Sequence, residues 1–121
     1  MSVRTDARGA RLINATRDAL LAERLFLADT YLSRLRGLIG RAPLASGDAL
    51  WIRPCQQVHT HFMGYPLHVV FLDAEQRVLR VVEHMRPWRV SPWVRQAKSV
   101  VEFNAARAIA VAEGDQLRVT E

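Results

Sequence analysis

The sequence has few of the residues that would cross-link the chain or hold it in a membrane. It contains a single cysteine, Cys55, so no disulfide can form within the chain. A lone thiol is typical of proteins from a reducing compartment, and we therefore expect a cytoplasmic location. No apolar run approaches the roughly 20 residues that cross a bilayer as a helix. The polar start, residues 1–6, does not resemble a signal peptide.

Lysine is almost absent, although the chain is basic. Arginine supplies 16 of the 17 basic residues, and the net charge is +5. Between Arg77 and Lys98 the only acidic residue is Glu83. The planar guanidinium of arginine binds phosphates, carboxylates and aromatic faces, which allows an anionic partner. No basic-helix or aromatic-platform pattern accompanies the charge, so nucleic-acid binding is not expected.

Length and apolar content indicate one domain with its own core. The chain has 121 residues, and half of them are apolar. That is enough to bury a core without cross-links. Residues 1–9 are polar and lack periodicity, so we expect a mobile arm there. Residues 10–121 are then the domain.

Alternation of apolar and polar residues predicts a mainly β protein. Strands are predicted over residues 11–14, 19–28, 49–52, 58–63, 67–72, 77–83, 99–103 and 116–120. The run 67–72 is apolar on both faces except at His68, which predicts a central buried strand. A turn at 73–76 would join it to 77–83 as a hairpin. We expect a curled antiparallel or mixed sheet, or a small barrel, of about seven strands.

Two short helices are predicted in addition. Asp29 and Thr30 offer an N-cap, and apolar residues follow at helical spacing as far as Gly40. This pattern predicts a helix over residues 30–39. Asn104 can cap a second helix over residues 105–112, which Gly114 would close. The predicted fold class is therefore α+β, with strands predominant.

Residues 55–63 hold the densest group of side chains that could carry chemistry. Cys55, His59, His61 and Met63 are ligands that suit copper or zinc. On a strand over 58–63, His59, His61 and Met63 would share one face. Further soft ligands lie at His68, His84 and Met85. The alternative is that the cysteine and methionine only fill the core.

Cys55 also allows a covalent mechanism. A thiol beside an imidazole can be activated as a thiolate. Asp73, Glu83 or Glu102 would then orient the imidazole. However, no cysteine-hydrolase signature surrounds Cys55, and no glycine cluster offers an oxyanion hole. We therefore do not expect an enzyme.

Aromatic and arginine side chains indicate a binding surface. The candidate ligand-binding residues are Trp51, Tyr65, Arg86, Trp88, Arg89 and Trp93. Such residues are the usual anchors of recognition surfaces, and prolines at 87 and 92 would stiffen the loop that carries them. The alternative is that the tryptophans plug the ends of a barrel while arginines stack on them.

Several short motifs occur in an order that is not generic. They are RGLIGR at 36–41, WI at 51–52, Cys55, VHTHFM at 58–63, PL at 66–67, VFLD at 70–73, Val78, RPW at 86–88, VE at 101–102 and GD at 114–115. In this order they resemble the domain of unknown function 192 family, over residues 25–119. The resemblance implies a compact, mainly β single domain. It implies no established reaction.

One position departs from the family pattern. Relatives usually carry an aspartate directly after the Pro-Leu pair, where this chain has His68. If that acid orients the segment at 58–63, its role here is filled differently or lost. Many relatives also follow a leader, which this sequence does not show. We expect a non-enzymatic binding or accessory domain for a protein or small ligand, without a cofactor. Copper or zinc binding is the alternative.

Overall fold

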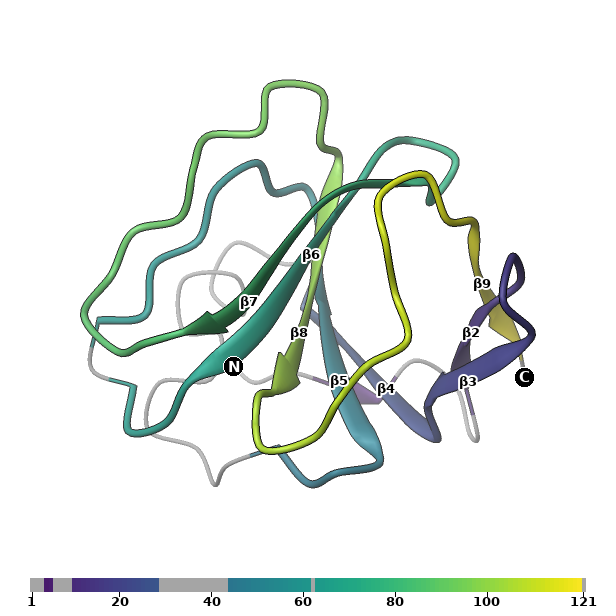
Figure 1. Cartoon of the computed structure of the whole chain (residues 1–121), viewed down its shortest axis with the longest axis horizontal. Coiled ribbons are helices and arrows are strands. Elements are labelled where there is room, and N and C mark those ends of the chain that lie inside the picture. The colour runs from purple at the N-terminus through teal and green to yellow at the C-terminus, as the bar shows by residue number, and fades with distance from the viewer. Residues whose placement is uncertain (1–3, 6–9, 29–43, 62, 121) are drawn as a thin grey trace.

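The computed structural model describes residues 4–5, 10–28, 44–61 and 63–120, and its strands form two sheets (Figure 1). The strands are β1 (Arg4–Thr5), β2 (Arg11–Asn14), β3 (Ala19–Ala22), β4 (Arg24–Ala28), β5 (Asp48–Ile52), β6 (Leu67–Leu72), β7 (Val78–Met85), β8 (Ser99–Asn104) and β9 (Leu117–Thr120). No helix occurs among these described residues, so none there is long and apolar enough to span a membrane. The prediction of a mainly β domain is confirmed.

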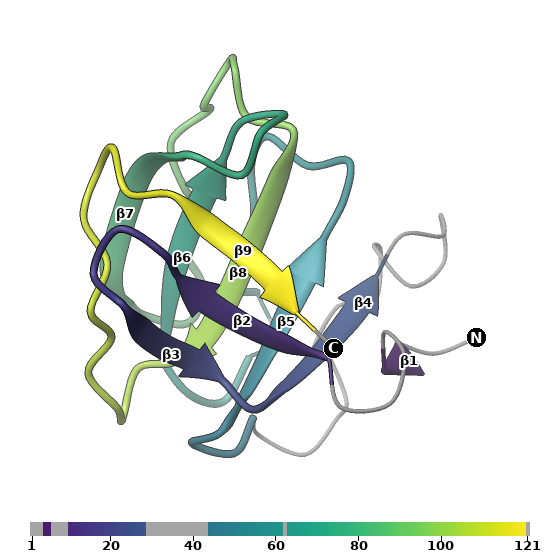
Figure 2. The same cartoon turned by 90° about the vertical axis from the view of Figure 1, so that its right-hand side faces the viewer.

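The larger sheet has six strands in the order β1-β4-β5-β8-β6-β7. β4 and β5 run parallel, and every other neighbouring pair is antiparallel. The smaller sheet is antiparallel and has the order β3-β2-β9. It covers one face of the larger sheet (Figure 2). The result is a mixed sheet that does not close into a barrel, because β1 and β7 remain its two edges.

The predicted β6–β7 hairpin is confirmed, and the central position of β6 in the sheet explains why that strand is apolar. All six residues of β6 are buried, because the strand lies between β7 and β8 and is covered on both faces. The turn is held by the Asp73 carboxylate, whose Oδ1 accepts hydrogen bonds from the backbone N–H groups of Glu75 and Arg77, both at 2.9 Å. An aspartate in this position favours a turn over a longer strand.

Two apolar cores lie on opposite faces of the six-stranded sheet. The first packs the sheet against β2, β3 and β9, and includes Leu12, Trp51, Phe103 and Leu117. The second packs the other face against long connecting loops, and includes Val58, Met63, Phe71, Ala97 and Val100. The second core therefore depends on residues outside the strands.

The predicted helix over 105–112 is wrong. The Asn104 carboxamide accepts a hydrogen bond from the Ala106 N–H at 2.9 Å and donates one to the Leu44 carbonyl at 3.0 Å. Beyond this turn the chain is irregular, and Ile109 and Val111 both pack against the first core. Two residues at a spacing of two meet one surface in an extended chain but not in a helix. The predicted helix over 30–39 lies outside the described residues.

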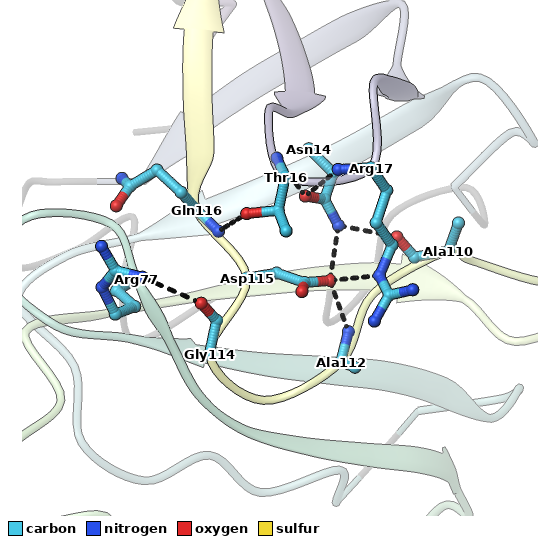
Figure 3. A network of polar contacts seen from close by, with 9 residues as sticks. All are labelled: Asn14, Thr16, Arg17, Arg77, Ala110, Ala112, Gly114, Asp115 and Gln116. Carbon is cyan, nitrogen blue, oxygen red and sulfur yellow. Dashed lines mark hydrogen bonds and ion pairs between the residues drawn. The ribbon is translucent and has the colours of Figure 1, made fainter.

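A polar network fixes the extended segment against the smaller sheet (Figure 3). Asp115 Oδ2 accepts hydrogen bonds from Asn14 Nδ2 at 2.8 Å, Arg17 Nε at 2.6 Å and the Ala112 N–H at 2.9 Å. The Asn14 amide also donates to the Ala110 carbonyl at 2.8 Å. Asn14 and Asp115 are both buried, so this network joins β2 to the turn before β9 inside the protein.

The predicted strand over 58–63 is also wrong. This segment makes one isolated bridge, between His59 and Val90, and the chain then turns because the Thr60 carbonyl accepts from the Met63 N–H at 3.1 Å. The expected common face is lost: His59 is exposed, His61 is half-buried and Met63 is buried in the second core. The other predicted strands are present, and 19–28 divides into β3 and β4.

Candidate functional site

Two long loops lie side by side over the face of the six-stranded sheet that is turned away from the smaller sheet (Figure 1). We call residues 55–61 the central segment and residues 86–93 the tryptophan loop. Backbone hydrogen bonds join them: Thr60 N–H to the Arg89 carbonyl at 2.8 Å, Trp88 N–H to the Thr60 carbonyl at 3.0 Å, and Ser91 N–H to the Val58 carbonyl at 2.9 Å. The two regions singled out in the sequence therefore form one surface.

Two buried hydroxyl groups hold this surface from inside. Thr60 Oγ1 donates to the Arg86 carbonyl and accepts from the Arg89 N–H at 2.9 Å. Ser91 Oγ accepts from the Val58 N–H and donates to the Pro92 carbonyl, both at 2.9 Å. Since both side chains are buried, these hydrogen bonds are shielded from water. The hydrogen bonds of these two buried hydroxyl groups therefore fix the conformation of the loop.

The tryptophan loop exposes large apolar side chains to solvent. The exposed fractions are 54% for Trp88, 59% for Val90 and 63% for Trp93. Arg86 and Arg89, which flank Trp88, are exposed as well. Trp88 has a φ of 64°, a left-handed conformation that costs an L residue roughly 1–2 kcal/mol. The hydrogen bonds of Thr60 on either side of Trp88 offset this cost.

The rings of the two segments meet edge to face. The centroids of His59 and His61 are 5.2 Å apart, and those of His61 and Trp88 are 5.4 Å apart, with interplanar angles of 61° and 80°. Beside this row lies an open hollow lined by Gln57, Val58, His59, His61 and Val90. The arrangement offers imidazole and indole edges next to an apolar side chain.

Four of the six predicted ligand-binding residues lie on the tryptophan loop and are exposed, namely Arg86, Trp88, Arg89 and Trp93. Trp51 lies in the first core with 5% exposure, and the Arg53 guanidinium carbon stacks 4.2 Å from its ring centroid. Tyr65 is half-buried against the second core, and its hydroxyl oxygen accepts from the Leu44 N–H at 3.3 Å. Burial raises the pKa of this phenol. Neither side chain lies on the tryptophan loop.

The predicted soft-metal ligands differ in their burial. His59 and His61 are adjacent near the surface, whereas Met63 is 8% exposed within the second core. The Cys55 side chain is half-buried, and its thiol donates to the Gln57 carbonyl at 3.3 Å. The three acids considered for orienting a catalytic imidazole lie apart, on the β6–β7 turn, β7 and β8, at Asp73, Glu83 and Glu102.

Another group has ligand atoms within metal-binding range. Among the described histidine, cysteine and acidic residues, only His68, Glu83 and His84 have ligand atoms that all lie within 4.8 Å of one another. However, His68 Nδ1 accepts from the His84 N–H at 3.2 Å, and Nε2 donates to the Arg107 carbonyl at 2.8 Å. Both ring nitrogens are therefore engaged, and a metal would have to displace a hydrogen bond.

Hydrogen bonds at both ring nitrogens hold His68 in place. Burial is the main cause that lowers the pKa of its imidazole, which favours the neutral ring. The neutral ring links β7 and the segment after β8, through His84 and Arg107. Neither of these two partners lies in 58–63, so the ring contacts of His68 differ from the orienting role expected for an acid at this position.

Sequence reasoning missed Thr60, Ser91 and Val90 as parts of this surface. A threonine and a serine give no local signal that distinguishes a buried clamp from a solvated hydroxyl. Val90 had one usable signal, because it lies between two tryptophans in a loop already predicted to be ordered. Its exposure could only be learned from the fold.

Replacing Thr60 by valine should loosen the tryptophan loop. Valine keeps the shape of threonine but leaves the Arg86 carbonyl and the Arg89 N–H without their partner. We expect a loss of about 1–3 kcal/mol in the free energy of unfolding. Amide hydrogen exchange at Trp88 and Arg89 should also become faster. Thr60→Ser, which retains the hydroxyl, is the matched control. Equal exchange in both variants would show that the hydroxyl does not hold the loop.

The sequence matches one family model over most of its length. The family model described as "Uncharacterized ACR" (DUF192) matches residues 12–119. A UPF0127 protein of Pyrococcus abyssi is 30% identical over 114 residues, which cover 88% of this chain and 94% of that protein. Another, from Thermococcus sibiricus, is 31% identical over 96 residues, and the match covers 75% of this chain and only 61% of that protein.

The fold is also shared with a solved structure. The crystal structure of a protein of unknown function from Novosphingobium aromaticivorans superposes with a TM-score of 0.75 at 19% identity, over 96% of this chain and 84% of that one. At this identity the likeness concerns the fold alone. The family match covers most of the sequence, and the expected resemblance is confirmed: the chain belongs to the domain of unknown function 192 family.

Proposed function

We propose that this domain binds a partner protein or small ligand through the tryptophan loop. The observation that carries the proposal is the exposure of Trp88, Val90 and Trp93, all above half, on a loop whose backbone is hydrogen-bonded to a buried threonine. Exposed apolar residues are common singly, but a group of them marks an interaction site more often.

Two properties of the tryptophan loop favour binding: the apolar area that its indoles can bury, and its ordered backbone. An indole buries on the order of 150–250 Å² when it is covered. At about 25 cal/mol per Å², covering the exposed part of two indoles yields several kcal/mol. Because the loop is already fixed by Thr60 and Ser91, little conformational entropy is lost on binding. Arg86 and Arg89 add donors for polar groups at the rim.

A fragment screen by protein-observed NMR tests this function without knowledge of the ligand. Aromatic and acidic fragments should shift the amide resonances of residues 56–61 and 86–93 more than the rest of the chain. Replacing Trp88 and Trp93 together by alanine should abolish these shifts. The cost in stability should be no more than about 1 kcal/mol, because both side chains are more than half exposed.

Leu20→Ala is the matched control, since Leu20 is another apolar side chain with 47% exposure but lies on β3 of the other sheet. Its fragment shifts should equal those of the wild type. If hits gather at another region, or survive loss of both tryptophans, the tryptophan loop is not the binding surface.

A second candidate function is copper or zinc binding, favoured by the 5.2 Å separation of the His59 and His61 rings. Two adjacent imidazoles can supply two ligands, and Cys55 and Met63 would have to move to supply more. Titration with copper(I) and zinc under reducing conditions, read by native mass spectrometry, tests it. Stoichiometric binding that is lost in His59→Ala supports the site, and no binding above background rejects it.

A further inference from the structure

β7 is an edge strand of unusual length for this protein. It runs over eight residues and pairs only with β6 in the described structure (Figure 1). Its first residues are covered on the outer side, because Val78 exchanges hydrogen bonds with Gly114 and Asp115, and Arg77 bridges Gln116. From Leu79 onward this cover ends among the described residues. The outer side of an edge strand presents N–H and C=O groups that can pair with another chain.

The open part of the edge is short and well delimited. The ladder to β6 is regular through Arg80, Val81 and Val82; its register shifts between Val78 and Arg80 and again before Met85. His84 has a φ of 54°, and its N–H is taken by His68 Nδ1, so neither its conformation nor its donor continues the edge. About five residues, 79–83, are therefore available, which is close to the usual length of a strand.

The edge leads directly into a hollow beside the tryptophan loop. This hollow has a volume of about 430 Å³ and is lined by Val82, Glu83, His84 and Met85 of β7 together with residues 86 and 89–92. Val90 also borders the hollow on the histidine side, so it forms a ridge between the two. A peptide that paired with the edge of β7 would therefore place its side chains next to Val90.

The charges along this path favour an acidic occupant. Arg80, Arg86 and Arg89 are exposed, against one exposed acid, Glu83. A second copy of the chain that paired through the same edge would bring arginines together, which disfavours self-association. An acidic segment would instead meet guanidinium groups that suit carboxylates.

We propose that β7 receives an extended acidic peptide segment as an added strand, with its apolar side chains beside Val90 of the tryptophan loop. This proposal names the partner class for the surface in the proposed function and rests on that function. Main-chain hydrogen bonds to residues 79–83 would supply affinity, and the arginines would supply selectivity for acidic side chains.

The test uses a labelled nine-residue peptide of aspartate and valine in which each face of the extended chain carries both residue types. Two derivatives carry N-methyl groups on the odd-numbered or on the even-numbered amides. Alternate residues of a strand present their N–H groups to opposite edges. One derivative should therefore bind like the parent, and the other should bind at least about tenfold more weakly. Amide exchange of residues 79–83 should slow when the parent peptide binds.

Charge reversal supplies the protein-side test. Arg80→Glu with Arg86→Glu should weaken binding by about tenfold or more, since 1.4 kcal/mol corresponds to a factor of ten. Arg118→Glu, an exposed arginine on β9, is the matched control and should bind as the wild type does. Melting temperatures of all variants show whether the fold is retained.

Each contrary outcome overturns a distinct statement. Binding that tolerates both methylated derivatives, or shifts that spare 79–83, would overturn strand addition and leave the tryptophan loop as the binding surface. If the peptide does not bind while fragments still bind at the loop, strand addition is likewise overturned and the tryptophan loop remains the binding surface. Tighter binding of an oligothymidylate or of phosphatidylglycerol vesicles would replace the peptide by nucleic acid or membrane. Failure of fragments and peptide together would reject the proposed function as well.

Discussion

Replacing Asp115 by alanine should lower the free energy of unfolding by about 2–4 kcal/mol. A single carboxylate oxygen accepts three hydrogen bonds, from Asn14, Arg17 and the Ala112 backbone (Figure 3). Asn14 is fully buried, so its amide would lose a partner where water cannot replace it. Urea unfolding followed by circular dichroism measures the change. Since β2 and the turn before β9 are joined here, unfolding should remain cooperative but shift to lower urea.

The effect of Asp115 should depend on pH with a defined sign. Burial alone would raise the pKa of its carboxyl, but hydrogen bonds from Asn14, Arg17 and the Ala112 N–H outweigh it and lower the pKa below 3.8. An acid with a depressed pKa stabilises the folded state above its unfolded pKa, and loses that contribution as pH falls further. The difference between wild type and Asp115→Ala should therefore shrink in acid.

Two substitutions separate the network from a general loss of charge. Asp115→Asn keeps the shape and one acceptor but loses the charge that faces Arg17, so an intermediate loss is expected. Asp73→Ala removes a carboxylate that accepts two backbone hydrogen bonds in an exposed turn. It should cost less, on the order of 1 kcal/mol. Equal losses for Asp115→Ala and Asp73→Ala would contradict a special role for the buried network.

Local sequence pattern was sufficient to predict an element of the fold where neighbours in sequence are also neighbours in space. The β6–β7 hairpin follows from an apolar run, an aspartate turn and a second alternating run, and each is a property of adjacent residues. The segment 105–112 has helix-compatible composition, yet Asn104 bonds to Leu44 and Ala112 bonds to Asp115. Such tertiary hydrogen bonds override propensity, and a single sequence does not reveal them.

The sequence predicted which residues the candidate surface contains better than it predicted how they are arranged. The loop at 86–93 was expected to be ordered and to carry Trp88 and Trp93, and both are in it. Trp51 belongs to an apolar strand between Leu50 and Ile52, a local signal for burial that could have removed it from the candidate set. No local signal showed that Thr60 would hold the loop, because its partners lie 26 and 29 residues away.

Replacing Glu102 by glutamine should change the pH dependence of stability by about 3 kcal/mol. Glu102 lies on β8 with Leu50 and Val69 as its cross-strand neighbours, and it is 5% exposed. Burial raises the pKa of its carboxyl from 4.5 to about 7. A shift of one pKa unit corresponds to about 1.4 kcal/mol, which yields this magnitude for the complete transition.

The sign of this change in stability with pH follows from proton linkage. An acid with a raised pKa is bound to its proton more tightly in the folded state, so its contribution is complete below the unfolded value of 4.5. That contribution is lost as pH rises through about 7, because the carboxyl group must then ionise where it is buried between Leu50 and Val69. Glutamine does not ionise and should keep its stability over this range. Relative to the wild type, Glu102→Gln should gain about 3 kcal/mol between pH 4 and pH 8.

The difference between two unfolding curves isolates this group from the rest of the protein. His68 acts in the opposite direction, since its lowered pKa makes stability fall as pH drops below 6.5, but it is present in both proteins and cancels. Glu113→Gln, which removes an exposed carboxyl, is the matched control and should give a flat difference. A flat difference for Glu102→Gln would mean that the buried carboxyl ionises at the same pH in the folded and unfolded chains. In that case the second core would tolerate its charge, and the loops that cover this face would have to solvate it.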